Sequence, residues 1–152
     1  MKRTEITTIV ESCAKGVALS LVFALGLVAC STTSSELRSS PRETGNFHLD
    51  LSYEEVRSNF VAATARCFHG GTPASFFYPE VRDIQPGQAT TIDVIQGGLA
   101  TRVLMSNEIT KNSSGGTDIT YFVGPFGVLV RWRPMIESWA TGVGSKCGFF
   151  SQ

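Results

Sequence analysis

A run of thirteen mostly apolar residues, from Val17 to Ala29, ends directly before Cys30. It separates an N-terminal segment from the rest of the chain. The run is shorter than the roughly 20 apolar residues that a helix needs to span a bilayer. Three basic side chains precede it, and a basic start followed by a short apolar stretch is typical of a cleaved signal peptide. We therefore predict that residues 1–29 are removed and that only the remainder folds.

The run closes on the order Leu27-Val28-Ala29-Cys30, which resembles the lipobox of bacterial lipoproteins. The resemblance implies cleavage before Cys30, a diacylglycerol thioether on its sulfur, and acylation of the new amino group by a fatty acid such as palmitate. Several acyl chains together anchor a protein stably in a membrane. In this family an Asp after the cysteine favours the inner membrane, so Ser31 implies the outer membrane, facing the periplasm. The alternatives are an ordinary secreted protein and a buried helix with a chance cysteine.

The segment after the anchor, Ser31 to Gly45, is rich in Ser and Thr and is interrupted by Pro41. It has almost no apolar side chains whose burial could offset the entropy lost on ordering. We predict that residues 30–45 form the lipidated cysteine and a flexible tether, and that residues 46–152 form one small globular domain.

Charge excludes one class of partner. Without residues 1–29 the chain has ten basic and eleven acidic side chains, with no Lys/Arg cluster. A nucleic-acid-binding domain needs a basic surface, and anionic head groups also attract such a neutral chain little. We therefore predict that the lipid at Cys30 provides the contact with the membrane and that nucleic acid is not a partner.

Two cysteines remain after Cys13 leaves with the signal peptide and Cys30 takes the lipid. Cys67 and Cys147 form an even pair in an oxidising compartment, which favours a disulfide. Closing a loop of about eighty residues restricts the unfolded chain by roughly 4 to 5 kcal/mol in the entropy model. Zinc bound by this pair and His69 is the alternative, but structural zinc sites usually have four ligands in paired short spacings. We predict the disulfide and no metal site.

The clearest helix signal covers residues 53–68. Ser52 stands three residues before Glu55, which is the spacing of a capping box. Apolar residues then recur at spacings of three and four, which places them on one face of a helix. These residues are Tyr53, Val56, Phe60, Ala63 and Cys67. His69-Gly70-Gly71 is predicted to end the helix, because glycine adopts the left-handed conformation without strain.

The remaining pattern is that of strands and turns. The predicted strands are a first one at 47–51 and then 75–78, 90–95, 99–105, 117–123 and 128–132. Pro134 and Gly142 bound a short last helix. The short turns favour antiparallel pairing, so we predict an α+β fold in which the first helix packs on a meander of about four strands, with a C-terminal helix and the disulfide as a staple. In its cysteine spacing the domain loosely resembles small uncharacterised envelope lipoproteins, which implies no activity.

No motif in the sequence predicts a catalytic residue or a cofactor. No serine lies in a nucleophile-elbow pattern, and the carboxylates are scattered. The aromatic residues outnumber those that one face of a small sheet needs to bury. They are Phe76, Phe77, Tyr78, Tyr121, Phe122, Phe126, Trp132 and Trp139. The leading hypothesis is a non-enzymatic module that binds another envelope protein, and the alternatives are a small-ligand or lipid-binding carrier and a small envelope enzyme.

Overall fold

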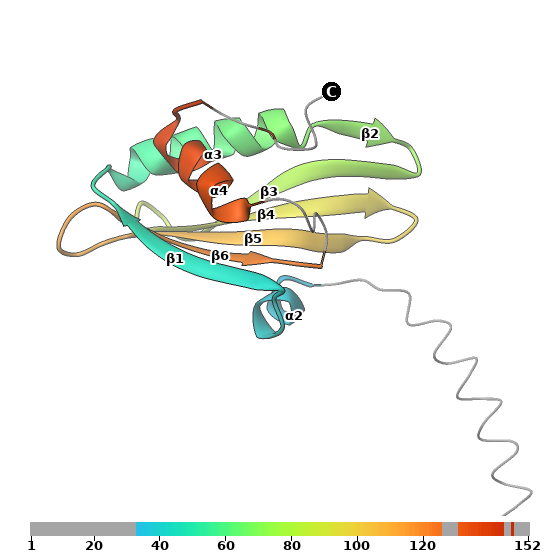
Figure 1. The fold of residues 1–152 in the computed structure, drawn as a ribbon, viewed down its shortest axis with the longest axis horizontal. Coiled ribbons are helices and arrows are strands. Elements are labelled where there is room, and N and C mark those ends of the chain that lie inside the picture. The colour runs from blue at the N-terminus through green and yellow to red at the C-terminus, as the bar shows by residue number, and fades with distance from the viewer. Residues whose placement is uncertain (1–32, 126–130, 145–146, 148–152) are drawn as a thin grey trace, which may run out of the picture. The chain divides into compact units, whose positions relative to one another are not determined.

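A six-stranded antiparallel sheet forms the centre of the computed structural model, which describes residues 33–125, 131–144 and Cys147 (Figure 1). The described elements, in chain order, are α2 (Ser34–Ser39), β1 (Glu43–Leu49), α3 (Tyr53–Cys67), β2 (Gly70–Thr72), β3 (Ser75–Gln85), β4 (Ala89–Gly98), β5 (Arg102–Lys111), β6 (Thr117–Val123) and α4 (Trp132–Thr141). The strand order is β1-β6-β5-β4-β3-β2. Because β1 and β2 lie at opposite edges, the helix α3 that joins them crosses the sheet.

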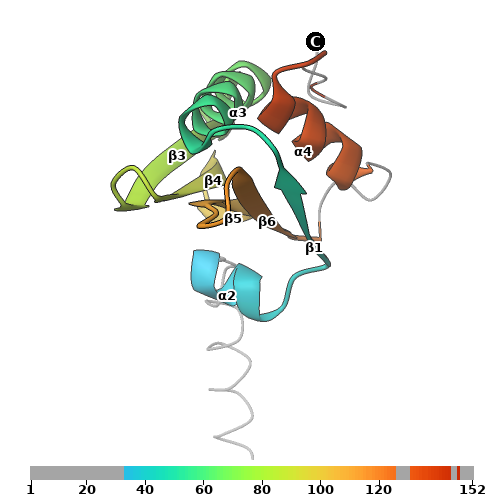
Figure 2. The same cartoon turned by 90° about the vertical axis from the view of Figure 1, so that its left-hand side faces the viewer.

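The helices cover the sheet from both sides. Figure 2 shows α3 and α4 on one face, which we call the inner face, and α2 on the other, which we call the outer face. Strand β6 has the side-chain alternation that this arrangement requires, with Thr117, Ile119, Tyr121 and Val123 buried and the residues between them half-buried. The predicted α+β class and the antiparallel pairing are confirmed. The sheet has more strands than the four or so predicted, because β2 to β6 form the meander and β1 pairs with β6.

Helix α3 confirms the predicted apolar stripe. All five of its members are buried, and Phe60 has no exposed surface where its ring meets Trp139 of α4 edge-on, with 5.7 Å between centroids. The Ser52 hydroxyl accepts a hydrogen bond from the Glu55 N–H at 3.2 Å, as the capping signal predicts. The helix ends at Cys67, and the two glycines after His69 lie in β2 rather than at the helix terminus. The inner face of the sheet and α3 thus enclose one core.

The predicted pair of cysteines forms a disulfide that closes this core. Cys67 lies in the last turn of α3 and Cys147 follows α4, with 4.9 Å between their Cα atoms. Both residues pack in or against the buried cluster under the two helices. Helix α4 ends at Thr141, and Gly142, which the sequence predicts as its end, caps it with a φ of +70° in the left-handed conformation.

The prediction of a flexible tether at 31–45 is wrong for the residues that the structure describes. The Thr33 hydroxyl accepts a hydrogen bond from the Glu36 N–H, and the Glu36 carboxylate accepts one from the Thr33 N–H at 2.7 Å, so α2 begins with a capping box. Leu37 is buried against the outer face, and β1 starts at Glu43. The segment has few apolar side chains, and it is held to the domain mainly by polar contacts instead. The domain therefore begins before residue 46.

Two further strand predictions need correction. Strand β3 continues through Pro79 to Gln85, although the proline was expected to end it. Beyond Phe77, β3 pairs only with β4 among the described strands, so its other side is an unpaired edge. A proline, which has no backbone N–H to donate, is tolerated in such an edge segment. The strand predicted at 128–132 falls largely outside the described residues, and Trp132 begins α4.

Candidate functional site

A cleft lined by aromatic residues lies where β2 meets β3. We call it the aromatic cleft, and its volume is about 490 Å³. Its lining residues are His69, Gly70, Gly71, Thr72, Pro73, Phe76, Phe77 and Tyr78. Volumes of about 300 to 1,000 Å³ are usual for small-molecule sites in proteins, and the cleft falls in that range although it is wide open to solvent.

Two of the lining aromatic side chains remain in contact with solvent. Phe76 and Tyr78 are 41% and 38% exposed, and their rings stack with 5.7 Å between centroids. Both alternate in phase with Arg82, which contacts α2, so they belong to the outer face. Tyr121 of β6 and the two tryptophans of α4, Trp132 and Trp139, are by contrast buried. The sequence had indicated a surplus of aromatic residues, and among those that the structure describes Phe76 and Tyr78 are the exposed ones.

Glycines give the Phe76 ring its position. Gly97 of β4 lies opposite Phe76, and a Cβ atom there would come within 2.5 Å of the phenyl ring. Gly71 of β2 has a φ of +130°, and a Cβ atom there would meet the Ser75 carbonyl oxygen at 2.3 Å. In the structure they allow a ring and a neighbouring strand to approach the backbone closely.

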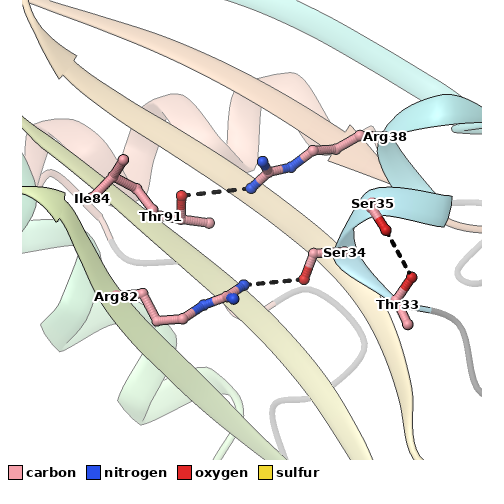
Figure 3. Close-up of a pocket in the computed structure, with 7 residues that line it drawn as sticks. All are labelled: Thr33, Ser34, Ser35, Arg38, Arg82, Ile84 and Thr91. Carbon is pink, nitrogen blue, oxygen red and sulfur yellow. Dashed lines mark hydrogen bonds between the residues drawn. The ribbon is translucent and has the colours of Figure 1, made fainter.

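A second hollow of about 540 Å³ lies between α2 and the outer face (Figure 3), and we call it the α2 pocket. Its lining residues are Thr33, Ser34, Ser35, Arg38, Arg82, Ile84 and Thr91. Figure 3 shows both arginine side chains reaching across the strands, Arg82 toward Ser34 and Arg38 toward Thr91. All the lining residues except Ile84 are of polar or charged type.

A buried carboxylate holds α2 at this pocket. Asp93 of β4 has no exposed surface, and both of its oxygens accept hydrogen bonds. Ser34 Oγ donates to Oδ2 at 2.6 Å, and Ser106 Oγ donates to Oδ1 at 2.6 Å. Arg82 of β3 pairs with Oδ2 and also donates to Ser34 Oγ. A buried charge is tolerated only when it is paired and hydrogen-bonded, and α2 supplies one of the required donors.

Arg38 ties the last turn of α2 to the same face. Its guanidinium pairs with Glu108 at 2.8 Å and donates to Ser106 Oγ at 3.1 Å. The guanidinium carbon also lies 5.9 Å from the centroid of the Phe122 ring, within the range of a cation–π contact. Each arginine of the α2 pocket thus has a carboxylate partner. The pocket carries no surplus charge for an ionic ligand, and its chemistry is that of a docking site for α2.

The predicted site residues are distributed as follows. Cys30 lies outside the described residues. Cys67 and Cys147 are joined to each other, so they do not act with His69 as zinc ligands, and His69 instead lines the aromatic cleft. Within the described ranges no group of three or more His, Cys, Asp and Glu side chains is placed to hold a metal ion.

A charged pair at the β1 edge of the sheet was also not foreseen from the sequence. His48 of β1 lies directly opposite Asp118 of β6, and its Nδ1–H donates to Asp118 Oδ1 at 2.7 Å. This hydrogen bond raises the pKa of His48 above its usual 6.5 and lowers the pKa of Asp118 below its usual 3.8. The alternation along each strand was visible in the sequence, but the pairing of β1 with β6 was not.

Comparison with protein-family models, curated proteins and solved structures found no match. In the part of the chain that the structure describes, no helix combines the length and the hydrophobicity needed to cross a membrane.

Proposed function

We propose that this chain is a lipid-anchored protein of the bacterial cell envelope whose domain binds another envelope protein through the aromatic cleft. The lipobox-like order before Cys30 supports the anchor, and Ser31 supports an outer-membrane position facing the periplasm. The domain acts as a binding module and not as an enzyme. The observation that carries the proposal is the stacked, exposed pair Phe76 and Tyr78 at the cleft.

Such a pair has the properties of a binding hot spot. Aromatic residues dominate the energy of protein interfaces because they bury a large area for few rotatable bonds. Here Phe76 sits over Gly97 and against Tyr78, so its ring is already positioned before a partner arrives. Little side-chain entropy then remains to be lost on binding. The near-neutral charge of the chain favours recognition by apolar contact over long-range attraction.

A small apolar ligand is the second candidate, and the cleft volume is the observation that favours it. About 490 Å³ is enough for a drug-sized molecule, and aromatic walls suit a lipid or another apolar compound. A carrier of this kind would bind the ligand without a protein partner.

Cross-linking in living cells distinguishes the two candidates. A photoreactive amino acid in place of Thr72, at the rim of the cleft, should form one defined adduct with another envelope protein. The double variant Phe76→Ala and Tyr78→Ala should lose that adduct. The control Val81→Ala, which changes an exposed residue of the same strand on the inner side, should keep it. A cleft that forms no protein adduct but yields a bound apolar compound on extraction would favour the carrier.

The anchor is tested separately through its sulfur. Cells fed a labelled fatty acid should label the wild-type chain, whereas Cys30→Ala should remain unlabelled and accumulate as uncleaved precursor. Ser31→Asp should move the labelled protein to the inner-membrane fraction. Equal labelling of the wild type and of Cys30→Ala would contradict the lipid attachment.

A further inference from the structure

The chain between Cys30 and the folded domain is very short. Helix α2 begins at Ser34 with Thr33 as its cap, so three peptide units separate Cys30 from the first capping residue. A fully extended chain covers at most about 3.6 Å per residue, so the Cα of Cys30 lies no more than about 11 Å from that of Thr33. A lipid on Cys30 would therefore hold the start of α2 at the depth of the head groups.

Helix α2 does not lengthen this connection by detaching from the domain, because it is hydrogen-bonded or ion-paired to three strands. Ser34 is bonded to the buried Asp93 of β4, and Arg38 is bonded to Ser106 and Glu108 of β5. Arg82 of β3 closes the same network by donating to Ser34. Release of α2 would leave Asp93 with fewer donors in a site that water does not reach. The depth of Thr33 therefore limits how far the adjoining part of the outer face can lie from the head groups.

An exposed apolar side chain lies across the α2 pocket from the start of α2 (Figure 3). Ile84 of β3 is 66% exposed and lines the α2 pocket together with Thr33 and Ser35. The rest of the lining consists of hydroxyl groups and of arginines that already have carboxylate partners. A corner with one large apolar side chain among hydroxyls and neutralised charges suits the boundary between head groups and acyl chains.

We propose that the outer face, at the corner formed by Thr33, Ser35 and Ile84, rests against the membrane that carries the Cys30 lipid. This inference rests on the proposed lipid anchor and goes beyond it, because an anchor with a flexible tether would set no orientation. The helices α3 and α4, on the inner face, then point away from the bilayer (Figure 2). The aromatic cleft starts at the other end of β3, eight residues from Ile84 to Phe76, or about 26 Å along the strand. Ser34 is bonded to Asp93, which lies opposite Glu80, midway between Phe76 and Ile84 on the same face. A protein partner can therefore occupy the cleft only when β3 is inclined to the bilayer, with Ile84 nearer to the lipid than Phe76.

Fluorescence quenching in vesicles tests this orientation. The full lipidated protein, purified from membranes with its disulfide intact, is labelled with a fluorophore on Ile84→Cys or, as the control, on Ala62→Cys. Ala62 is exposed on α3, on the opposite side of the sheet. Each form is reconstituted into phosphatidylethanolamine and phosphatidylglycerol vesicles that contain a lipid with a spin label near the head group. We expect quenching at position 84 to be several-fold stronger than at 62, and iodide in the water to quench in the reverse order.

A longer linker provides the matched control for the role of α2. Inserting roughly ten Gly and Ser residues after Ser31 adds up to about 35 Å of reach without changing the domain. Lipid quenching at position 84 should fall toward the value at 62. A label on Ser35→Cys, at the same pocket, repeats the measurement at a second exposed position.

The outcomes separate the orientation from the anchor. Protein that does not sediment with the vesicles overturns the lipid anchor and the orientation together. Protein that sediments but is quenched equally at 84 and 62 overturns the orientation and leaves the anchor intact. Shielding of position 84 from both lipid and iodide would show that protein covers this corner, which also overturns the proposal. Equal results in vesicles with and without phosphatidylglycerol are expected, because the arginines of the corner are already paired.

Discussion

Ser34 of α2 donates a hydrogen bond of 2.6 Å to Asp93 of β4, a carboxylate with no exposed surface. The two residues are 59 positions apart, and their contact joins the segment next to the proposed anchor to the middle of the sheet. Because Asp93 also accepts from Ser106 and pairs with Arg82, Ser34 is one member of a network and not an isolated bond. The network is what turns a polar stretch of sequence into part of the domain.

Removing the charge of Asp93 should loosen α2. In Asp93→Asn the serine donors face an amide whose nitrogen cannot accept, so we expect a loss of about 1 to 3 kcal/mol in the free energy of unfolding. Glu80 lies opposite Asp93 on β3 but is exposed, and Glu80→Gln should stay within about 0.5 kcal/mol of the wild type. Denaturant unfolding measures both values. Hydrogen exchange at the Leu37 amide, which bonds to the Thr33 carbonyl, should accelerate in Asp93→Asn; an unchanged rate would mean that α2 does not depend on the carboxylate.

The core under α3 should be most sensitive at Phe60. Its ring is fully buried and meets Trp139 edge-on, so Phe60→Ala leaves a cavity and should lower the free energy of unfolding by about 3 to 5 kcal/mol. Glu54 is exposed on the same helix, and Glu54→Ala should change it by no more than about 0.5 kcal/mol. Thermal and denaturant melts of the domain that begins at Ser31 provide the measurement. A neutral Phe60→Ala in a folded protein would contradict the packing of α3 on the sheet.

The stripe on α3 was predictable because helical periodicity is a local property. Residues three and four apart share a face whatever lies opposite, so Phe60 and its neighbours could be assigned to the core without knowledge of the sheet. The docking of α2 was not predictable in this way. Ser34, Arg82 and Ser106 look like solvated positions when each is considered alone, and only the strand order brings them to Asp93.

The sequence indicated that the candidate site would be aromatic, but it did not indicate where on the domain the site would lie. The number of aromatic residues indicated that some would stay exposed. Which of them did so depended on what α2, α3 and α4 cover, and neither the position of α2 nor the pairing of β1 with β6 has a local sequence signal. Phe76 and Tyr78 remain exposed because they lie on the outer face at the cleft where β2 meets β3.

The disulfide should contribute a large part of the stability. Cys67 and Cys147 are 80 positions apart, and opening a loop of that length should lower the free energy of unfolding by about 4 to 5 kcal/mol in the entropy model. We expect the thermal midpoint to fall by at least several degrees when the purified protein is reduced. Peptide mapping without reductant should recover the two cysteines in one cross-linked fragment. Two free thiols in protein from the periplasm would contradict the pairing.

The pair of His48 and Asp118 should make stability depend on pH. Because the hydrogen bond raises the pKa of His48 in the folded state, the contribution of the histidine is fully present below its usual 6.5 and is lost as the pH rises through the raised value. The pKa of Asp118 is lowered, so its contribution is present above its usual 3.8 and is lost as the pH falls through the lowered value.

The pair therefore stabilises the folded state most between pH 3.8 and pH 6.5, the usual pKa values of the two groups. His48→Gln should destabilise the domain more at about pH 5 than at about pH 9. In an NMR titration the His48 ring should titrate above its usual value in the wild type, and Asp118→Asn should move its midpoint down. Asp50 lies 3.4 Å from the other ring nitrogen but is fully exposed, so Asp50→Asn should shift the midpoint much less. An unchanged His48 midpoint in Asp118→Asn would show that the cross-strand hydrogen bond does not form in solution.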